Sequence, residues 1–490
     1  MSSLDFLKPI VSKLPEVRPP RYPPTIKERF AWTGIALITF FVMYNISAVG
    51  VRAGAPGFDF LQVVTASRVG SLVTTGIGPI VLASIFLQLF AGAKIINIDL
   101  TNPDQRALFH GTQKLLAIIL AFLEAAIFVI FARLSLTPLF PFLGESIIIS
   151  GGIEKIYAPY TTLLVILQIA LGSIILLFLD EVVSRYGFGS GISLFIAAGV
   201  SFSIISGIIF LFTGPGGVIE DLAAGGANAI AAVLLDLVPL FFTLLIFAVV
   251  IYAEGMKVEI PLAFERAKGL GGRFPIKFLY ISNIPVILAS ALLLNIQFFS
   301  LSLKDVSLMV GDFNVAHLIG YVDSSGRLTD GLLYFLSPIY VSHQIDVFTF
   351  LSSMLETSTP IFGIPQIVHV ITYLVFLITL CIIFGLFWVE TTNMGPKEVA
   401  AQLDKSGLQI PGFRRDPRIV EKVLERYIPT ITILGSAFVG LLAGLADLTG
   451  ALGTGTGILL TVGILYRLYE DLRSKQVFET SSLLSMLARE

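Results

Sequence analysis

Long apolar stretches with almost no charged side chains recur along the whole of this 490-residue sequence. An α-helix needs about 20 predominantly apolar residues to cross the hydrocarbon core of a bilayer. Ten runs of roughly that length occur, at residues 30–50, 72–91, 112–133, 160–179, 190–212, 230–253, 276–299, 366–390, 428–446 and 451–469. We therefore predict an all-α integral membrane protein with ten transmembrane helices.

Composition agrees with this prediction, because hydrophobic residues make up 55% of the chain and charged residues only 13%. Soluble domains are about one quarter charged, and a soluble chain of this size could not cover its surface with so few charges. The net charge of −2 provides no basic field for nucleic acid. The single cysteine, Cys381, and four histidines without ligand spacing predict neither a disulfide nor a metal site, and we expect no cofactor.

Lysine and arginine predict the orientation of the chain in a cell membrane. If the N-terminus is cytosolic, the inside segments hold 26 of the 32 basic residues. Cytosolic loops of membrane proteins carry such an excess, so we predict a multi-pass protein with both termini in the cytosol. The segment Leu4–Leu14 mixes apolar residues with lysines and predicts an amphipathic helix lying on the membrane.

Two predicted cytosolic loops, 254–277 and 391–427, are large and basic. Their charge suits topology and lipid headgroups, and it equally suits an anionic partner such as ribosomal RNA. The second loop contains helix-like stretches at Pro396–Lys405 and Pro417–Tyr427. The long outside loop of about 300–365 indicates no function.

Three Gly-rich breaks interrupt the apolar pattern, at Ala55–Gly78, Tyr186–Gly191 and Gly450–Gly457. The first predicts a half-helix that dips into the protein, because irregular backbone at membrane depth needs protein or water around it; an external loop is the alternative. Breaks at matching places in two sets of five spans favour an inverted repeat divided near Gly214–Gly217. Charges within spans are scarce, with Glu124, Asp236 and Asp447 the main candidates.

Five segments together resemble the SecY family, the pore subunit of the Sec protein translocon, in its archaeal and eukaryotic style. The segments are TASRVGSLVTTGIGPIV (65–81), LFLDEVVSRYGFGSGISLFIAAG (177–199), RFPIKFLYISNIPVIL (273–288), GPKEVAAQLDKSGLQIPGFR (395–414) and GALGTGTGILLTVGILYRLYE (450–470). Their order and their placement relative to the ten runs match the family over nearly the whole chain.

The resemblance implies an hourglass pore between two inverted five-helix halves, closed at its waist by aliphatic side chains. The matching positions are Ile77, Val81, Ile192, Ile196, Ile287 and Leu460, with Leu459 as the fallback for the last. Ile77 with Val81, and Ile192 with Ile196, are i, i+4 pairs that share a helix face. Without the resemblance these residues would be read as ordinary core aliphatics.

The resemblance also implies a plug, a lateral gate and a ribosome-binding surface. The plug residues are Phe58, Phe60, Leu61, Val63, Val64 and Ala66. The gate, between the second and seventh spans, contains Glu124 and Asn295, which we expect to pair, and Leu82 where relatives have threonine. The ribosome contacts are Arg266, Lys268 and Arg414, with Arg415 adjacent.

We divide the chain accordingly into a cytosolic amphipathic segment (1–29), a first half (30–213) with its plug at about 55–70, a second half (214–470) with the two basic loops, and a cytosolic tail (471–490). The implied function is a passive channel that moves unfolded secretory polypeptides across the membrane and releases membrane helices sideways into lipid. The implied partners are a SecE (gamma) subunit, a small beta subunit, the ribosome, signal peptides, nascent chains and membrane lipid.

Two other function classes compete with the channel. A secondary transporter on an inverted repeat would need ion-coordinating or charged groups near the midplane, where only Glu124 stands out. An intramembrane enzyme would need paired aspartates, a Ser–His pair or a metal site within the spans, and the sequence suggests none. We therefore expect a protein that is not an enzyme.

Overall fold

The computed structural model describes most of the chain. The described residues are 4–53, 66–92, 95–96, 98, 102–131, 135–150, 153–214, 217–225, 229–264, 271–281, 283–302, 309–310, 313–314, 316–322, 328–339, 347–392, 394–405, 408–409 and 417–487. The plug positions before Ala66 and all four predicted ribosome contacts lie outside these residues.

Helices of different lengths overlap all ten predicted runs. They are α2 (Ile26–Asn45), α4 (Gly78–Gly92), α5 (Pro103–Phe131), α6 (Pro159–Tyr186), α7 (Gly191–Thr213), α9 and α10 (Ala229–Asp236 and Val238–Gly255), α11 (Ile284–Ser302), α15 (Ile367–Thr391), α17 (Pro417–Asp447) and α18 (Gly455–Leu487). Among the described residues, six helices are long and apolar enough to cross a membrane, and two shorter apolar helices lie at Gly78–Ala91 and Ile284–Leu293. The protein is thus a multi-pass membrane protein, and the count of ten remains a prediction.

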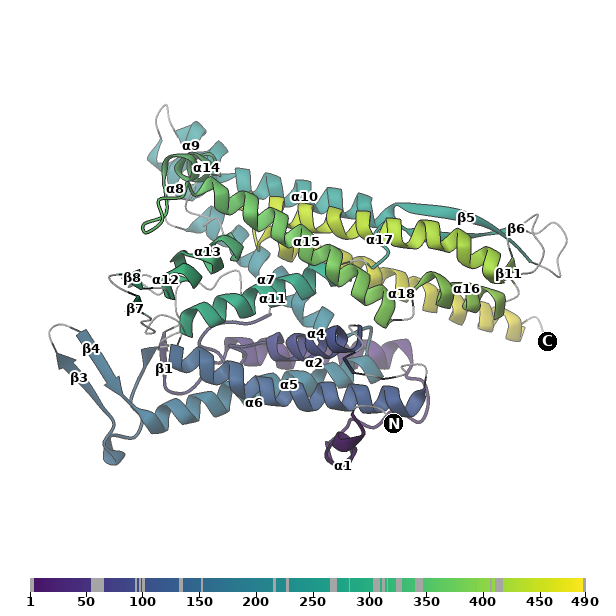
Figure 1. Cartoon of the computed structure of the whole chain (residues 1–490), viewed down its shortest axis with the longest axis horizontal. Helices are drawn as coiled ribbons and strands as arrows, with labels where there is room; N and C mark the ends of the chain where they lie inside the picture. Colours follow the sequence, from purple (N-terminus) through teal and green to yellow (C-terminus); the bar gives the residue numbers. More distant parts are fainter. Residues whose placement is uncertain are drawn as a thin grey trace.

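Most helices of the two predicted halves form two neighbouring groups, with α7 of the first half lying between them (Figure 1). On one side α4, α5 and α6 pack in order, with α2 and α7 against α6; on the other, α11, α15 and α17 pack in order, with α18 against α17 and α10. The two groups meet where α4 contacts α11 and α15, and where α7 contacts α18. The inverted relation between the halves remains a prediction.

Short elements join these helices. They are η1 (Asp5–Leu7), α1 (Lys8–Val11), β1 (Val51–Ala53), β2 (Ser135–Leu136), η2 (Pro141–Leu143), β3 (Ser146–Ser150), β4 (Ile153–Tyr157), α8 (Val218–Ala224), β5 (Lys257–Phe264), β6 (Gly271–Lys277), β7 (Met309–Val310), β8 (Phe313–Asn314), α12 (Ala316–Ile319), β9 (Tyr321–Val322), β10 (Leu328–Asp330), α13 (Leu332–Leu336), α14 (Val347–Glu356), α16 (Pro396–Lys405) and β11 (Leu408–Gln409). The β3–β4 hairpin and the β5–β6 hairpin project at opposite ends of the molecule (Figure 1).

The two basic loops contain more structure than their charge indicates. Residues 257–264 and 271–277 form an antiparallel hairpin, and β11 of the other loop pairs with β5. Both helix-like stretches are confirmed, because Pro396–Lys405 is α16 and Pro417–Tyr427 forms the start of α17, which continues without interruption into the predicted span. Its apolar residues Val420, Leu424 and Ile428 are buried together with residues of α16, and this amphipathic packing extends the helix beyond its membrane portion.

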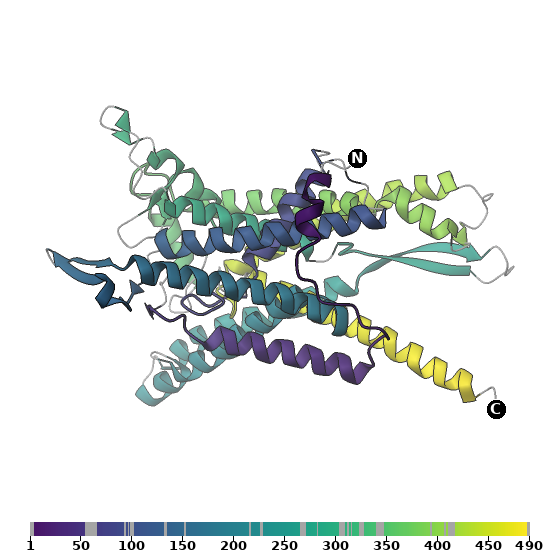
Figure 2. The same ribbon diagram turned by 90° about the horizontal axis from the view of Figure 1, so that it is seen from below.

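The N-terminal segment also differs from prediction. Instead of one helix over Leu4–Leu14, η1 and the four-residue α1 cover Asp5–Val11. Val11 packs over Gly111 of α5, where an added Cβ would lie 2.1 Å from Val11 Cγ1. The segment therefore contacts the helix bundle itself, and Figure 2 shows it crossing the surface of the first-half helices. One side of the segment thus packs on protein, while Phe6 and Ile10 stay 72% and 51% exposed, so its position on the membrane remains a prediction.

Candidate functional site

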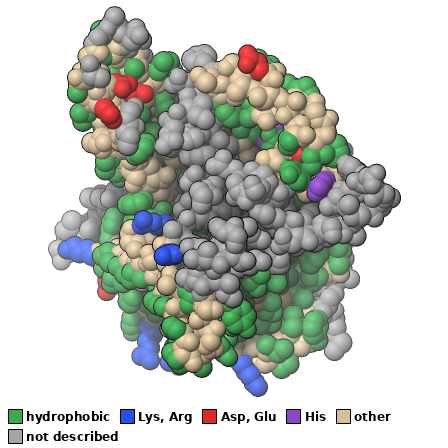
Figure 3. All heavy atoms as spheres, turned by 90° about the vertical axis from the view of Figure 1, so that its left-hand side faces the viewer, with side chains coloured by type: hydrophobic (Ala, Val, Ile, Leu, Met, Phe, Trp, Pro, Cys, Tyr) green, Lys and Arg blue, Asp and Glu red, His purple; other side chains and the backbone are tan. Residues whose placement is uncertain are grey.

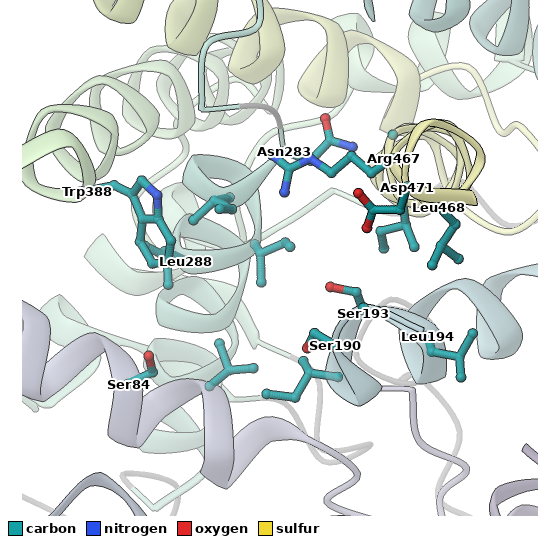
Figure 4. Close-up of a pocket in the computed structure, with 17 residues that line it drawn as sticks. Ser84, Ser190, Ser193, Leu194, Asn283, Leu288, Trp388, Arg467, Leu468 and Asp471 are labelled. Carbon is teal, nitrogen blue, oxygen red and sulfur yellow. The ribbon is translucent and has the colours of Figure 1, made fainter. Parts of the chain in front are cut away.

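A cavity of about 390 Å³ lies between the two groups of helices. Its walls come from α4 and α7 of the first group and from α11, α15 and α18 of the second. About half of the lining residues are aliphatic, and polar side chains lie among them, as Figure 4 shows. The polar lining residues are Ser84, Ser190, Ser193, Asn283, Arg467 and Asp471. Both groups of helices thus contribute to the walls of the cavity, as a pathway between the two groups would require.

The six predicted ring residues converge at this cavity. Val81, Ile192 and Ile287 line it. Ile77, Ile196 and Leu460 are at most 1% exposed and belong to the same hydrophobic cluster as the other three. In both i, i+4 pairs one member lines the cavity and the other, one turn away, is buried; the six residues are called the aliphatic layer below. The fallback residue Leu459 is buried in this cluster too.

A hydroxyl on α6 holds the backbone that carries Ile77. Ser173 Oγ donates to the carbonyl of Gly76 at 2.9 Å and lies 2.7 Å from Thr75 Oγ1. The turn approaches α6 so closely that a Cβ on Gly172 would lie 1.8 Å from the Leu72 carbonyl oxygen. Backbone polar groups without a regular helical partner are thereby satisfied. The start of α4 is therefore anchored to α6 directly beside a ring residue.

A carboxylate holds the backbone of the next ring residue. The N–H of Ile192, in the first turn of α7, donates to Asp180 Oδ1 at 2.9 Å, and Ser190 Oγ donates to the same oxygen at 3.3 Å. Carboxylates stabilise helix N-termini because the first N–H groups of a helix have no intrahelical partner. The predicted break at Tyr186–Gly191 is confirmed, since α6 ends at Tyr186 and α7 begins at Gly191.

The last helix of the chain begins in the same manner. Asp447, at the end of α17, accepts from the N–H of Thr456 at 2.9 Å and from its hydroxyl at 2.6 Å. Tyr373 donates its hydroxyl to Asp447 at 3.1 Å. The break at Gly450–Gly457 is also confirmed, with φ angles of +64° at Gly450 and +78° at Gly453 that favour glycine. In each group, a carboxylate at the end of one helix caps the helix that follows.

The predicted gate residues lie on neighbouring helices. Leu82 of α4 is buried, and Glu124 of α5 is 6% exposed. Asn295 lies on α11, which contacts both α4 and α5, but its side chain is outside the described residues. Glu124 Oε1 has no hydrogen-bond partner within the described part of the chain. The expected pairing of Glu124 with Asn295 therefore stays a prediction.

Of the plug positions, only Ala66 falls within the described residues. It is fully buried with a φ of +49°, and it lies against Gly199 of α7. The side chains of Phe58, Phe60, Leu61, Val63 and Val64 lie outside the described part. A buried Ala66 places the end of this segment inside the protein rather than on its surface, which favours the inserted arrangement over an external loop.

The predicted ribosome contacts belong to two segments, and each segment directly follows a strand. These two strands, β5 and β11, pair with each other. β11 pairs with β5 at Leu408 with Phe264 and at Gln409 with Ala263. Phe264 directly precedes the undescribed segment containing Arg266 and Lys268, and Gln409 directly precedes the one containing Arg414 and Arg415. Both basic segments therefore leave the fold from adjacent points.

Sequence reasoning missed the polar residues that hold the ring backbone, namely Ser173, Asp180 and Asn283. Nothing in the sequence around each one distinguishes it from an ordinary polar residue. One local signal existed, because Ser173 and Asp180 are seven apart and so share a face of α6. The partners of that face become evident only in the assembled bundle.

A family model described as SecY matches residues 71–469 of the chain. The chain belongs to the SecY family. The protein translocase subunit SecY of Methanocaldococcus jannaschii is 44% identical over 486 residues, covering 98% of this chain and 99% of that protein. The resemblance predicted from the five motifs is confirmed, and SecY membership gives no support to the secondary transporter.

Solved structures agree with SecY membership. A protein-conducting channel is 42% identical with a TM-score of 0.75, covering 96% of this chain and 97% of that one. Sec61 in the canine ribosome–channel complex from the endoplasmic reticulum is 41% identical with a TM-score of 0.72, again covering 96% and 97%. The fold is thus shared with translocation channels over nearly its whole length.

Proposed function

We propose that this SecY-family chain is the pore of a translocon, conducting unfolded secretory polypeptides across the cell membrane. The proposal is supported by the aliphatic layer, of which Val81, Ile192 and Ile287 line the central cavity while the other three members are buried in the same hydrophobic cluster. The residues of this layer come from four helices belonging to both groups: α4 with the turn before it, α7, α11 and α18. No covalent step is needed, because a channel only has to open and close a path.

The aliphatic layer has the properties that a polypeptide seal requires. A narrow apolar constriction resists ions because water leaves it readily. Flexible side chains such as those of Ile192 and Ile287 can fit around passing chains of any sequence without specific hydrogen bonds. The polar side chains that line the cavity make it compatible with water. The layer would therefore close around a chain in transit and against itself at rest.

Replacing Ile192 and Ile287 with serine should open the seal. Both residues line the cavity, so the change leaves the fully buried aliphatics in place. We expect a several-fold rise in ion leak when the chain and its co-purifying subunits are reconstituted into vesicles. Ile205→Ser is the matched control, because Ile205 also lies on α7 but is 58% exposed on its outer face. Equal leak from the ring variant and the parent would refute the seal.

The lateral gate is proposed along the contact of α4 with α11 and α15. This contact joins the two groups on one side of the cavity, while α7 and α18 join them on the other. Separation of α4 from α11 would open the cavity toward lipid, which suits release of an apolar segment. A chemical crosslink between α4 and α15 should hold such a segment inside; continued release into lipid would contradict the gate.

The ribosome is the partner proposed for the two basic loops, as a relative is found in a ribosome–channel complex. The pairing of β5 with β11 makes the two basic segments begin from neighbouring strands, which would let their charges act on the same partner. We further propose SecE (gamma) and beta subunits as partners of the chain, which co-purification of small single-span proteins would test.

Reversing the charges of Arg266, Lys268, Arg414 and Arg415 to glutamate should weaken co-sedimentation with ribosomes, most clearly at low salt, because phosphate contacts release counterions. The matched control reverses four cations of the N-terminal segment, at Lys8, Lys13, Arg18 and Arg21. Undiminished co-sedimentation of the loop variant would leave the two loops as lipid contacts only.

A further inference from the structure

Asn283 lies immediately before α11 and is 3% exposed. Its Nδ2 donates to the main-chain carbonyl of Leu459 at 2.8 Å and, more weakly, to that of Leu460 at 3.4 Å. Both acceptors belong to α18, and Leu460 is a member of the aliphatic layer. An amide has two N–H donors and a carbonyl oxygen has two lone pairs, so these bonds add to the helix's own.

The same residue also holds the other ring helix of the second group. The carbonyl of Asn283 accepts from the N–H of Ile287 at 3.1 Å, in the first turn of α11. Asn283 thus touches the backbone of α11 through its main chain and that of α18 through its side chain. Two ring residues, Ile287 and Leu460, are connected by one buried amide.

Two further features make this connection specific. Gly463 leaves the space for the amide, since a Cβ there would lie 1.9 Å from Asn283 Nδ2. Arg467, farther along α18, donates to the carbonyl of Ile281 at 3.1 Å. The turn before α11 is therefore attached to α18 at two points about two helical turns apart, which determines how far along α18 it sits. Figure 4 shows Asn283 and Arg467 side by side at the cavity.

We infer that Asn283 is a positioning residue that keeps Ile287 and Leu460 at one level in the closed aliphatic layer. The inference rests on the proposed seal and deepens it. Without the bond, α18 could shift along α11 and the two side chains would no longer meet in the same plane. Bonds of this kind are modest in strength, so opening can break them and closing can restore them.

Asn283→Leu keeps the volume of the side chain and removes its donors. We expect an ion leak roughly 5–10 times that of the parent, the population shift that the loss of one buried hydrogen bond of typical strength produces. Gly463→Ala should act in the same direction, because its methyl group displaces the amide. Asn45→Leu is the matched control, since Asn45 of α2 also donates to a helical carbonyl but lies on an exposed surface.

Asn283→Asp provides a readout that a purely structural role would not move. The charged groups around the site are Glu254 of α10 and Arg467, Glu470 and Asp471 of α18. As a carboxylate the new side chain has no donor for the two carbonyls, whereas protonation gives it an O–H. The leak of this variant should therefore fall as the pH is lowered, while the parent shows no such fall.

Ile192→Ser with Ile287→Ser, measured in the same vesicles, separates the two ideas. If this ring variant leaks while Asn283→Leu and Gly463→Ala are as tight as the parent, Asn283 does not position the layer. If the ring variant itself is tight, the proposed seal fails. Should Asn283→Leu not fold, the isosteric Asn283→Asp decides, and a leak independent of pH would overturn the positioning role.

Discussion

Glu145, in the segment between α5 and α6, shows how one side chain can start a membrane helix from outside the membrane. Its carboxylate accepts from the N–H and the hydroxyl of Thr161, at 2.7 and 2.6 Å, and from the N–H of Phe140 at 3.0 Å. Burial by itself raises the pKa of Glu145, but the hydrogen bonds from Thr161 and Phe140 together lower it below the ordinary value. A negative charge at the start of α6 also interacts favourably with the helix dipole.

This environment predicts an acid-dependent stability. A lowered pKa in the folded state means that the stabilisation by Glu145 is complete above the unfolded pKa of about 4.3 and is lost as the pH falls through the folded pKa. Glu145→Gln should lower the melting temperature at pH 7 and reduce the loss on acidification. Thermal unfolding at pH 7 and pH 4 measures both, with the exposed Glu16→Gln as control. If the melting temperatures of the parent and of Glu145→Gln change equally with pH, ionised Glu145 does not stabilise the fold.

At the scale of elements, the N-terminal segment acts as a strap over α5 and α6. Lys114 of α5 pairs with Glu181 of α6 and also donates to the carbonyl of Pro15. The other oxygen of Glu181 accepts from the N–H of Val17 at 3.1 Å. The buried Lys114 ammonium also lies 4.5 Å from the ring centroid of Phe178. One ion pair thus ties three elements together.

Close packing between α15 and α17 depends on small residues. Ser436, Gly440 and Gly444 recur every four residues on α17, and an added Cβ on the two glycines would meet α15 side chains. Small residues at this spacing let membrane helices approach closely. At Gly440 the Cβ would lie 3.1 Å from both Cys381 Sγ and Ile378 Cα. The interface has no room there for a larger side chain.

Gly440→Val should therefore destabilise the second group of helices by about 1–3 kcal/mol, the usual cost of overpacking. Cys381 is fully buried at this interface and is the only cysteine of the chain, so its reaction with a thiol dye during heating reports the loss of packing. Gly34→Val is the control, because nothing lies within 4 Å of a Cβ at that position. If Cys381 reacts at the same temperature in Gly440→Val as in Gly34→Val, the packing of α15 against α17 at Gly440 is not tight.

At the scale of the whole molecule, the two ends are formed by different structural elements. The C-terminal part of α18 and the β5–β6 hairpin lie at one end, and the β3–β4 hairpin at the other (Figure 1). Figure 3 views the second end, where hydrophobic side chains surround the few described charges. Since the basic loops belong to the first end, we propose from the positive-inside rule that this end lies in the cytosol.

This orientation predicts the outcome of labelling intact cells with an impermeant thiol reagent. Tyr157→Cys, at the end of β4, should react from outside, since Tyr157 is 61% exposed. Tyr22, in the N-terminal segment, is 83% exposed, so Tyr22→Cys should react only after the membrane is opened. The unchanged chain is the control because Cys381 is buried. Reaction of Tyr22→Cys in intact cells would reverse the orientation.

Much of the architecture follows from local features of the sequence. A bilayer selects helices by length and hydropathy, so the apolar runs alone predicted where α6, α7 and α15 lie. Glycine-rich breaks likewise predicted the starts of α7 and α18, because such backbone conformations exclude most other residues. The i, i+4 spacing of Ile77 and Val81 placed them on one face. These properties depend on residues close together in the chain, which a sequence displays directly.

Only the tertiary structure decided which polar groups hold those helices in register. Asn283 binds carbonyls 176 and 177 residues away, and Asp180 binds the N–H of a different helix. The start of α17 at Pro417 depends on packing against α16, and the N-terminal strap depends on Lys114 and Glu181. Such contacts arise when helices come together, because a donor or acceptor becomes specific only once its partner is placed beside it and water is excluded.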